Sequence, residues 1–149
     1  MSIRISALSA LGALIALVAT TGTTVAEDRP YAEGTVSVVS SIRTEPGQSD
    51  AYMRYLATTY KQLMEEQKKA GIIVDWSVFT ARPRTPDGPN LYLVTTYKNL
   101  AAMDGLQDKT DAIQEKFIGN QEARDAAMVA RGKMRSMVGS EVIRKVEFK

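Results

Sequence analysis

The sequence predicts an α+β domain in which a four-stranded antiparallel sheet carries helices on one face. Four segments show the alternation of apolar and polar residues that is typical of strands. Apolar residues at helical spacing fill the two long intervals between these segments. The resulting order is strand, helix, strand, strand, helix, strand. The second helical interval is the longer one, which predicts an extended helical segment before the last strand.

The first strand and the first helix are marked by a change of periodicity. Val38 and Ile42 alternate with polar residues within 35–43, which predicts a strand. Helical spacing takes over from 49 to 70, and Gly71 suits the end of that helix. The predicted apolar stripe comprises Tyr52, Met53, Leu56, Tyr60, Leu63, Met64 and Gln67.

Two further strands form a predicted hairpin. Alternating residues span 72–82 and 90–97, and the segment between them holds three prolines and a glycine, which suit a long exposed loop. Asn99 follows as a good N-terminal cap for a short helix over 100–106.

The last third of the chain predicts one long helical stretch and a final strand. Asp111 and the three residues after it resemble a capping box, so we place the start of the stretch there. It extends to about Val138, with a possible break near Gly119, and Gly139 ends it. The last strand is predicted over 140–149.

The N-terminal residues resemble a secretory signal sequence. Arg4 supplies a positive charge, 7–19 is apolar, and Ala26 ends a small-residue cleavage site before Glu27. The apolar run is shorter than the ~20 residues that a spanning helix needs. We therefore expect residues 1–26 to be a signal peptide, with a periplasmic or secreted product and no stable membrane insertion after cleavage. The alternative is an uncleaved membrane anchor.

The remaining chain predicts one domain over 35–149, preceded by a flexible lead-in at 27–34. The whole chain carries a net charge of +2, so nothing electrostatic favours nucleic acid as a partner. A short basic run, Arg131, Lys133 and Arg135, is interrupted by a methionine. We interpret it as a solvated helix face.

The sequence contains no histidine and no cysteine. Their absence excludes a Ser-His-Asp triad, a cysteine nucleophile, a disulfide and the common histidine-ligated metal and haem sites. We expect no metal and no cofactor. Any chemistry would run through Asp, Glu, Tyr, Arg, Lys, Ser or the ligand itself.

The order of the predicted elements is the ferredoxin-like plan. Two stretches carry a closer resemblance to the dimeric α/β-barrel families, namely 44–47, which leads from a strand into the first helix, and 97–102, which leads into the second. These families include antibiotic-biosynthesis monooxygenase-like, EthD-like and stress-responsive barrel proteins. The resemblance implies a homodimer that pairs through its sheets, and a ligand pocket between each sheet and its helices.

The resemblance leaves the activity open. It implies a range that runs from cofactor-free oxygenation, haem chemistry and isomerisation to no known activity. This chain departs from the pattern because it lacks histidine and because the segment before its last strand is long. The first departure weighs against catalysis, and the second would lengthen or cap the pocket.

Four aromatic residues are candidates for the walls of that pocket. Tyrosine and tryptophan rings give flat apolar surfaces with a polar edge, which suits a planar organic ligand. The candidates are Tyr52, Tyr60, Trp76 and Tyr97. The alternative is ordinary packing in the core and at a dimer interface.

Two arginines and one acid complete the candidate site. Arg124 and Arg131 share the apolar face of the last helix if that helix is continuous, and a guanidinium there would suit a carboxylate or phenolate. If Gly119 or Gly132 breaks the helix, both become surface groups. Asp75 is the candidate general acid or base, provided that burial raises its pKa.

Three functions remain open from the sequence. The first is an exported protein that binds a small, partly aromatic molecule. The second is a cofactor-free oxygenase or isomerase acting on a small aromatic or carbonyl substrate, and the third is a structural or envelope-stress homodimer.

Overall fold

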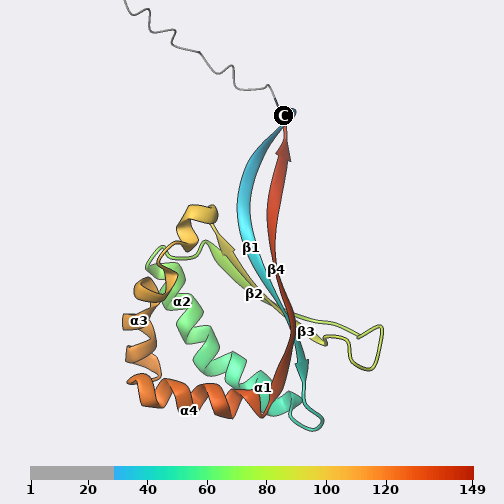
Figure 1. Cartoon of the computed structure of the whole chain (residues 1–149), viewed down its shortest axis with the longest axis vertical. Helices are drawn as coiled ribbons and strands as arrows, with labels where there is room; N and C mark the ends of the chain where they lie inside the picture. The colour runs from blue at the N-terminus through green and yellow to red at the C-terminus, as the bar shows by residue number, and fades with distance from the viewer. Residues whose placement is uncertain (1–28) are drawn as a thin grey trace, which may run out of the picture.

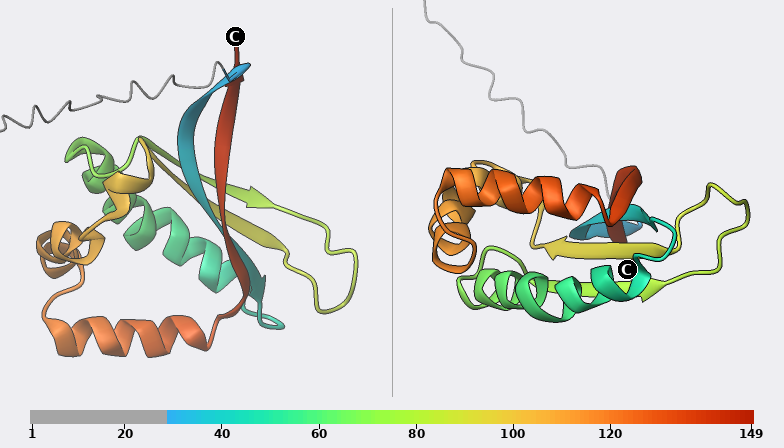
Figure 2. Two further views of the ribbon diagram at one scale, coloured as in Figure 1. Left: turned by 45° about the horizontal axis from the view of Figure 1, so that its top comes forward. Right: turned by 90° about the horizontal axis from the view of Figure 1, so that it is seen from below.

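A computed structural model describes residues 29–149, and the predicted signal peptide at 1–26 lies outside them. The described part has two layers. One is a four-stranded sheet, and the other consists of the helices, which lie on one side of that sheet (Figure 1, Figure 2).

The sheet confirms the predicted order of elements. Its strands are β1 (Tyr31–Thr44), β2 (Asp75–Thr80), β3 (Leu91–Tyr97) and β4 (Arg135–Phe148). In space they run β2-β3-β1-β4, and every neighbouring pair is antiparallel. The first and last strands of the chain therefore lie side by side.

Strand β1 begins earlier than the sequence predicts. The expected flexible lead-in at 27–34 is wrong for its last four residues, because Tyr31–Gly34 belong to β1. Tyr31 pairs with Phe148, and Glu33 pairs with Val146. The two strands thus form a long ribbon that extends past β2 and β3 (Figure 1).

The first helical run has the predicted extent and an unpredicted interior. It consists of α1 (Ser49–Tyr55), a π-helical segment η1 (Leu56–Tyr60) and α2 (Lys61–Lys69). Gly71 follows with φ of 70°, as expected for the left-handed residue after a helix. Of the predicted stripe, Met53 is 41% exposed, whereas Tyr52 and Leu56 are buried.

The helices after β3 begin at different residues from those predicted. Asn99 caps the short 3₁₀ helix η2 (Leu100–Met103), since its side chain accepts a hydrogen bond of 2.9 Å from the Ala102 N–H, as predicted. The predicted start at Asp111 is wrong. Helix α3 spans Leu106–Phe117, so Asp111 lies in its interior.

The long helical stretch predicted to reach Val138 is broken twice. Gly119 adopts φ of 114° and ends the first part, and Asn120 caps α4 (Gln121–Gly132) by accepting a 3.0 Å hydrogen bond from the Ala123 N–H. Strand β4 then begins at Arg135, five residues earlier than predicted, because 135–137 pair with the end of β1. The second break lies between the end of α4 at Gly132 and the start of β4.

The core lies where the first helical run packs against the middle of the sheet. Its central residues are Ile42, Tyr52, Leu56 and Leu91. Ile42 and Tyr52 are 0% and 1% exposed. Burial of such side chains contributes ~1.5–3 kcal/mol each. This packing fixes the helix against the sheet and forms one end of the cavity described below.

Candidate functional site: a groove between the sheet and the helices

A cavity of about 290 Å³ opens between the sheet and the helices, and we call it the groove. Its lining comes from every layer of the fold. The residues are Val38, Ser40 and Ile42 from β1, Tyr52 and Tyr55 from α1, Tyr60 from η1, Met64 from α2, Leu93, Thr95 and Tyr97 from β3, Arg131 from α4, and Arg135 and Met137 from β4.

The floor of the groove follows from strand geometry. Alternate residues of a strand point to the same face of a sheet, so the sets 38, 40, 42 and 93, 95, 97 face the helices together. The sequence predicted both sets from their alternation. Ser40 and Thr95 add hydroxyl groups to an otherwise apolar floor.

The tyrosine wall depends on the π-helical segment. In a regular α-helix, side chains five residues apart point about 140° away from each other. In a π-helix each hydrogen bond spans five residues, and the Lys61 N–H bonds to the Leu56 carbonyl in this way. The wider turn lets Tyr55 and Tyr60 face the same cavity, which an uninterrupted α-helix would not allow.

Burial keeps three tyrosines of the groove, Tyr52, Tyr60 and Tyr97, protonated. Burial raises the pKa of Tyr60 to about 12, against a smaller lowering effect of the neighbouring Thr95 side chain. Burial also raises the pKa of Tyr52, and the positive charges of Arg135 and then Arg131 partly oppose it. The pKa of Tyr97 is raised by burial as well. These hydroxyl groups therefore act as neutral hydrogen-bonding groups at ordinary pH.

Two arginines face the tyrosines across the groove. The Arg131 Nη1 donates a hydrogen bond of 3.0 Å to the Tyr55 hydroxyl, and its guanidinium carbon lies 5.9 Å from the centre of the same ring. Arg135, the first residue of β4, also lines the groove. The Nε atoms of Arg131 and Arg135 are buried and have no hydrogen-bond partner.

Trp76 supports the groove from behind and does not line it. Its ring packs edge-on against Tyr60, with the ring centres 5.7 Å apart and the planes at 87°. Its Nε1 donates a 3.0 Å hydrogen bond to the Glu65 carboxylate. Of the four predicted aromatic residues, Tyr52, Tyr60 and Tyr97 meet at the groove, and Trp76 holds Tyr60 in place.

Arg124 lies outside the groove, beside a second cavity of about 320 Å³. The two cavities share Tyr55 and Arg131, and the second is otherwise walled by η1, α3 and α4, by Ile118 and by Met134. Although the helix breaks at Gly119, Arg124 turns inward and forms an ion pair of 3.1 Å with Asp111. Its side chain is only 19% exposed.

Asp75 lies at the start of β2, away from the groove. Its carboxylate accepts a hydrogen bond of 2.8 Å from Lys68, and its side chain is 58% exposed. The hydrogen bond from Lys68, with a further one from the Trp76 backbone, lowers the pKa of Asp75 below its usual value. The burial that an acid or base role requires is therefore absent.

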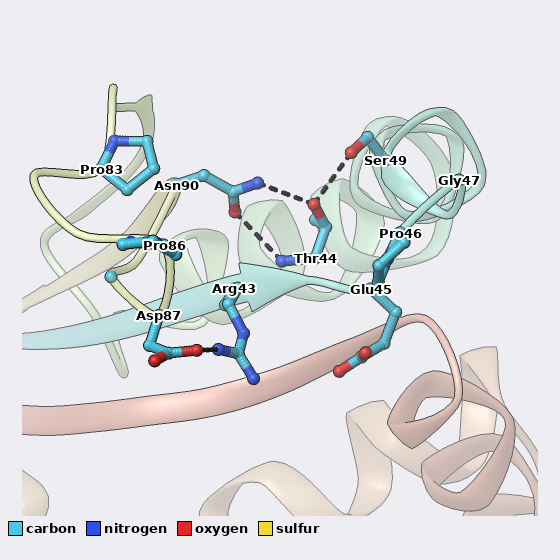
Figure 3. A pocket seen from close by; sticks show the side chains of 11 residues that line it. Arg43, Thr44, Glu45, Pro46, Gly47, Ser49, Pro83, Pro86, Asp87 and Asn90 are labelled. Carbon is cyan, nitrogen blue, oxygen red and sulfur yellow. Dashed lines mark hydrogen bonds and ion pairs between the residues drawn. The ribbon is translucent and has the colours of Figure 1, made fainter.

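A larger cavity of about 530 Å³ lies at the loop end of the sheet, and we call it the loop pocket (Figure 3). Five of its polar residues are paired with one another. The Asn90 amide oxygen accepts from the Thr44 N–H at 3.0 Å, its nitrogen donates to the Thr44 hydroxyl at 2.7 Å, and that hydroxyl also contacts Ser49 at 2.8 Å. Arg43 pairs with Asp87 at 2.8 Å.

Two polar residues of the groove, Tyr55 and Arg135, were not predicted to line it. Tyr55 falls off the predicted stripe because the π-helical turn changes the phase of the helix. Arg135 was interpreted as part of a solvated helix face, and this is wrong because it is the first residue of β4. The only available signal was the spacing of Arg135 and Met137, which suits one face of a strand.

Comparisons with known proteins support the architecture. HapK from Hahella chejuensis is similar at a TM-score of 0.50 and 14% identity, over 74% of this chain and 91% of its own. The fold is ferredoxin-like. No protein-family model and no curated protein matches the sequence.

Two further solved structures are similar to this ferredoxin-like domain. A protein from Shewanella oneidensis is 20% identical over 78% of this chain and 96% of its own, with a TM-score of 0.47. A dimeric ferredoxin-like protein from an uncultured marine organism is 10% identical over 77% and 95%, with a TM-score of 0.48.

Residues 29–149 contain neither a cluster of metal-binding side chains nor a helix that could span a membrane. Within that range, no group of three or more acidic side chains is placed to hold a metal ion. No helix of the same range has the length and apolar character needed to cross a membrane.

Proposed function

We propose that this chain is an exported homodimer that binds a small, partly aromatic molecule in the groove. The observation that carries the proposal is the groove itself, a cavity of about 290 Å³ in which tyrosine rings and two arginines converge. Small-molecule sites combine apolar and aromatic walls with a few polar groups that fix orientation. The sequence expectation of export rests on residues 1–26.

The lining of the groove favours binding over catalysis, because it offers no group that is ready to accept a proton. Its lining includes no carboxylate, and the raised pKa values of Tyr52 and Tyr60 keep their hydroxyl groups protonated. A reaction that begins by proton abstraction needs a base within hydrogen-bond reach of the substrate. The groove offers hydrogen-bonding groups and positive charge instead, which suit recognition.

The homodimer is supported by the exposed apolar residues of β4, an edge strand. Six of its large apolar side chains are 44% to 83% exposed, namely Met137, Val138, Val142, Ile143, Val146 and Phe148. An exposed apolar edge strand is a template for pairing with another chain. No helix in 29–149 covers the opposite face of the sheet (Figure 2), so a second copy would bury both features.

Native mass spectrometry tests the three parts of the proposal together. The full chain is expressed in a bacterium and purified from its periplasm. We expect an N-terminus at Glu27, a mass of two chains, and an additional mass from a small molecule that denaturation releases. A monomer with no added mass, purified at high concentration, would contradict both the dimer and the binding function.

A matched pair of variants assigns the bound molecule to the groove. Ser40→Phe places a ring in the groove, and we expect the added mass to disappear. Ser41→Phe makes the same change one residue along, on the opposite face of the sheet, and should keep the added mass. If Ser41→Phe has any effect, it should reduce the amount of dimer. Retention of the ligand by both variants would place its site elsewhere.

A further inference from the structure

The two arginines of the groove are left with unused hydrogen-bonding capacity. A guanidinium carries five N–H donors, and the Nε donors of Arg131 and Arg135 are buried without a partner. A buried donor without a partner destabilises the fold, and more so when it is charged. A protein does not keep two such groups in one cavity for the sake of stability, so the arrangement points to an acceptor that enters from outside.

The charge of the groove has the same implication. Among residues 29–149, no carboxylate forms an ion pair with Arg131 or Arg135, and no acidic side chain lines the groove. Both arginines act on the Tyr52 hydroxyl, so their charges lie near one point of the cavity. Arg124, whose Nε is likewise buried without a partner, differs in charge, because its ion pair with Asp111 neutralises it. The groove therefore concentrates positive charge that the protein itself does not compensate.

The shape of the groove limits the size of the anion. Ligand pockets typically span ~300–1,000 Å³, and the groove, at about 290 Å³, lies at the small end of that range. The walls are the rings of Tyr52, Tyr55, Tyr60 and Tyr97. Flat apolar walls of this size suit one planar ring, and a guanidinium fork matches the two oxygens of a carboxylate.

We propose that the groove binds a monocyclic planar carboxylate, with its negative charge held by Arg131 and Arg135 and its ring among the tyrosines. This inference rests on the proposed binding function and specifies the class of ligand. Arg131 is already oriented by its hydrogen bond to Tyr55, so the charged end of the ligand enters a partly ordered site. Arg135 supplies the second contact from β4.

Benzoate and benzamide are the probes that test the charge. They have the same ring and nearly the same shape, but only benzoate is anionic. We expect calorimetric titration to show benzoate binding at least about tenfold more tightly than benzamide, because only the carboxylate brings a negative charge to the arginines. Added salt should reduce this preference. Fluorescence of Trp76, which packs against Tyr60, gives a second readout.

Variants assign the preference to the two arginines. Arg135→Gln and Arg131→Gln should each weaken benzoate binding about tenfold or more and weaken benzamide binding by a smaller factor, so that the preference for benzoate is lost. Arg135→Lys keeps the charge but not the fork, and should fall between Arg135→Gln and the unchanged protein. Arg84→Gln, in the exposed loop between β2 and β3, makes the same charge change outside the groove and should have no effect.

The outcomes separate this inference from the function on which it rests. Equal binding of benzoate and benzamide, or a preference that survives both arginine-to-glutamine substitutions, overturns the carboxylate assignment and leaves small-molecule binding in place. Failure of both probes to bind, together with no retained small molecule in native mass spectrometry, contradicts both proposals. Circular dichroism of each variant shows that a lost preference does not come from unfolding.

Discussion

The loop pocket and the groove differ in how their polar groups are satisfied. The loop pocket is the larger cavity, at about 530 Å³, and its main polar groups bond to each other. Asn90 forms hydrogen bonds with Thr44, and Arg43 forms an ion pair with Asp87 (Figure 3). The groove is smaller, at about 290 Å³, and keeps the Nε donors of two arginines without partners.

This difference shows why volume alone is a poor guide to a binding site. A cavity whose donors and acceptors are paired gives a ligand nothing to replace, so its hydrogen bonds stabilise the fold. A cavity with buried unpaired charge offers a ligand favourable contacts that water-filled space does not. The comparison predicts that changes in the groove alter ligand binding, whereas changes in the loop pocket alter stability or nothing.

Deletion of Thr58 should have the largest effect. It removes the extra residue of the π-helical turn, so α1 would rotate by about 100° relative to α2. Tyr52, which is 1% exposed, would leave the core, and Tyr55 would leave the groove. We expect the free energy of unfolding to fall by about 3–5 kcal/mol, as measured by urea denaturation.

Thr58→Ala is the control for this deletion, since it keeps the length of the helix. It removes only the exposed hydroxyl that donates to the Arg54 carbonyl at 2.8 Å. A change below about 1 kcal/mol is expected. If the deletion is as mild as this substitution, the phase of the helix does not hold the tyrosine wall in place.

Alkaline pH should destabilise the fold through the groove. The pKa of Tyr60 is about 12 in the folded protein, compared with 10.0 for an ordinary tyrosine. As the pH rises from about 10 to 12, the unfolded chain loses this proton while the folded chain keeps it, so stability falls across that window. The loss is about 2–3 kcal/mol.

Tyr60→Phe has no proton to lose and should remove this part of the alkaline decline. Urea denaturation of both proteins at a series of pH values makes the comparison. Tyr92→Phe, at a tyrosine outside the groove, should leave the decline unchanged. If the free energy of unfolding falls equally with rising pH in the Tyr60→Phe variant and in the unchanged protein, another group causes the loss of stability at alkaline pH.

Asn90→Ala tests the loop pocket, with a smaller expected effect. The substitution leaves the Thr44 N–H without its acceptor, and Thr44 is 8% exposed. A cost of about 1–3 kcal/mol is expected from thermal or urea unfolding. Ligand binding in the groove should not change. A loss of binding without a loss of stability would reverse the roles that we assign to the two cavities.

Asp87→Asn should have the smallest effect. The carboxylate is 92% exposed, and exposed ion pairs contribute ~0–1 kcal/mol. We expect thermal unfolding and ligand binding to remain unchanged within error. A clear loss of binding in this variant would mean that the loop pocket takes part in recognition.

The sequence predicted the parts of the groove that depend on local periodicity. Alternation placed Ile42 on one face of β1, and Leu93 and Tyr97 on one face of β3; the structure shows that both faces meet the helices. It did not place Tyr55, because a π-helical turn shifts the phase without any composition that marks it. Arg135 could not be assigned to the groove from the sequence, because its position depends on the pairing of β4 with β1. Contacts between segments far apart in the chain decide that pairing.

The position of Arg135 in the chain has a consequence for the order in which the protein is made. Strand β1 lies in the middle of the sheet, yet one of its two partners, β4, is synthesised after the other elements of this domain. Contacts between such distant segments form slowly, because a long stretch of chain must first be closed into a loop. A nascent chain that already holds the groove tyrosines, of which Tyr97 is the last, therefore still lacks both arginines. The site is completed only when β4 pairs with β1.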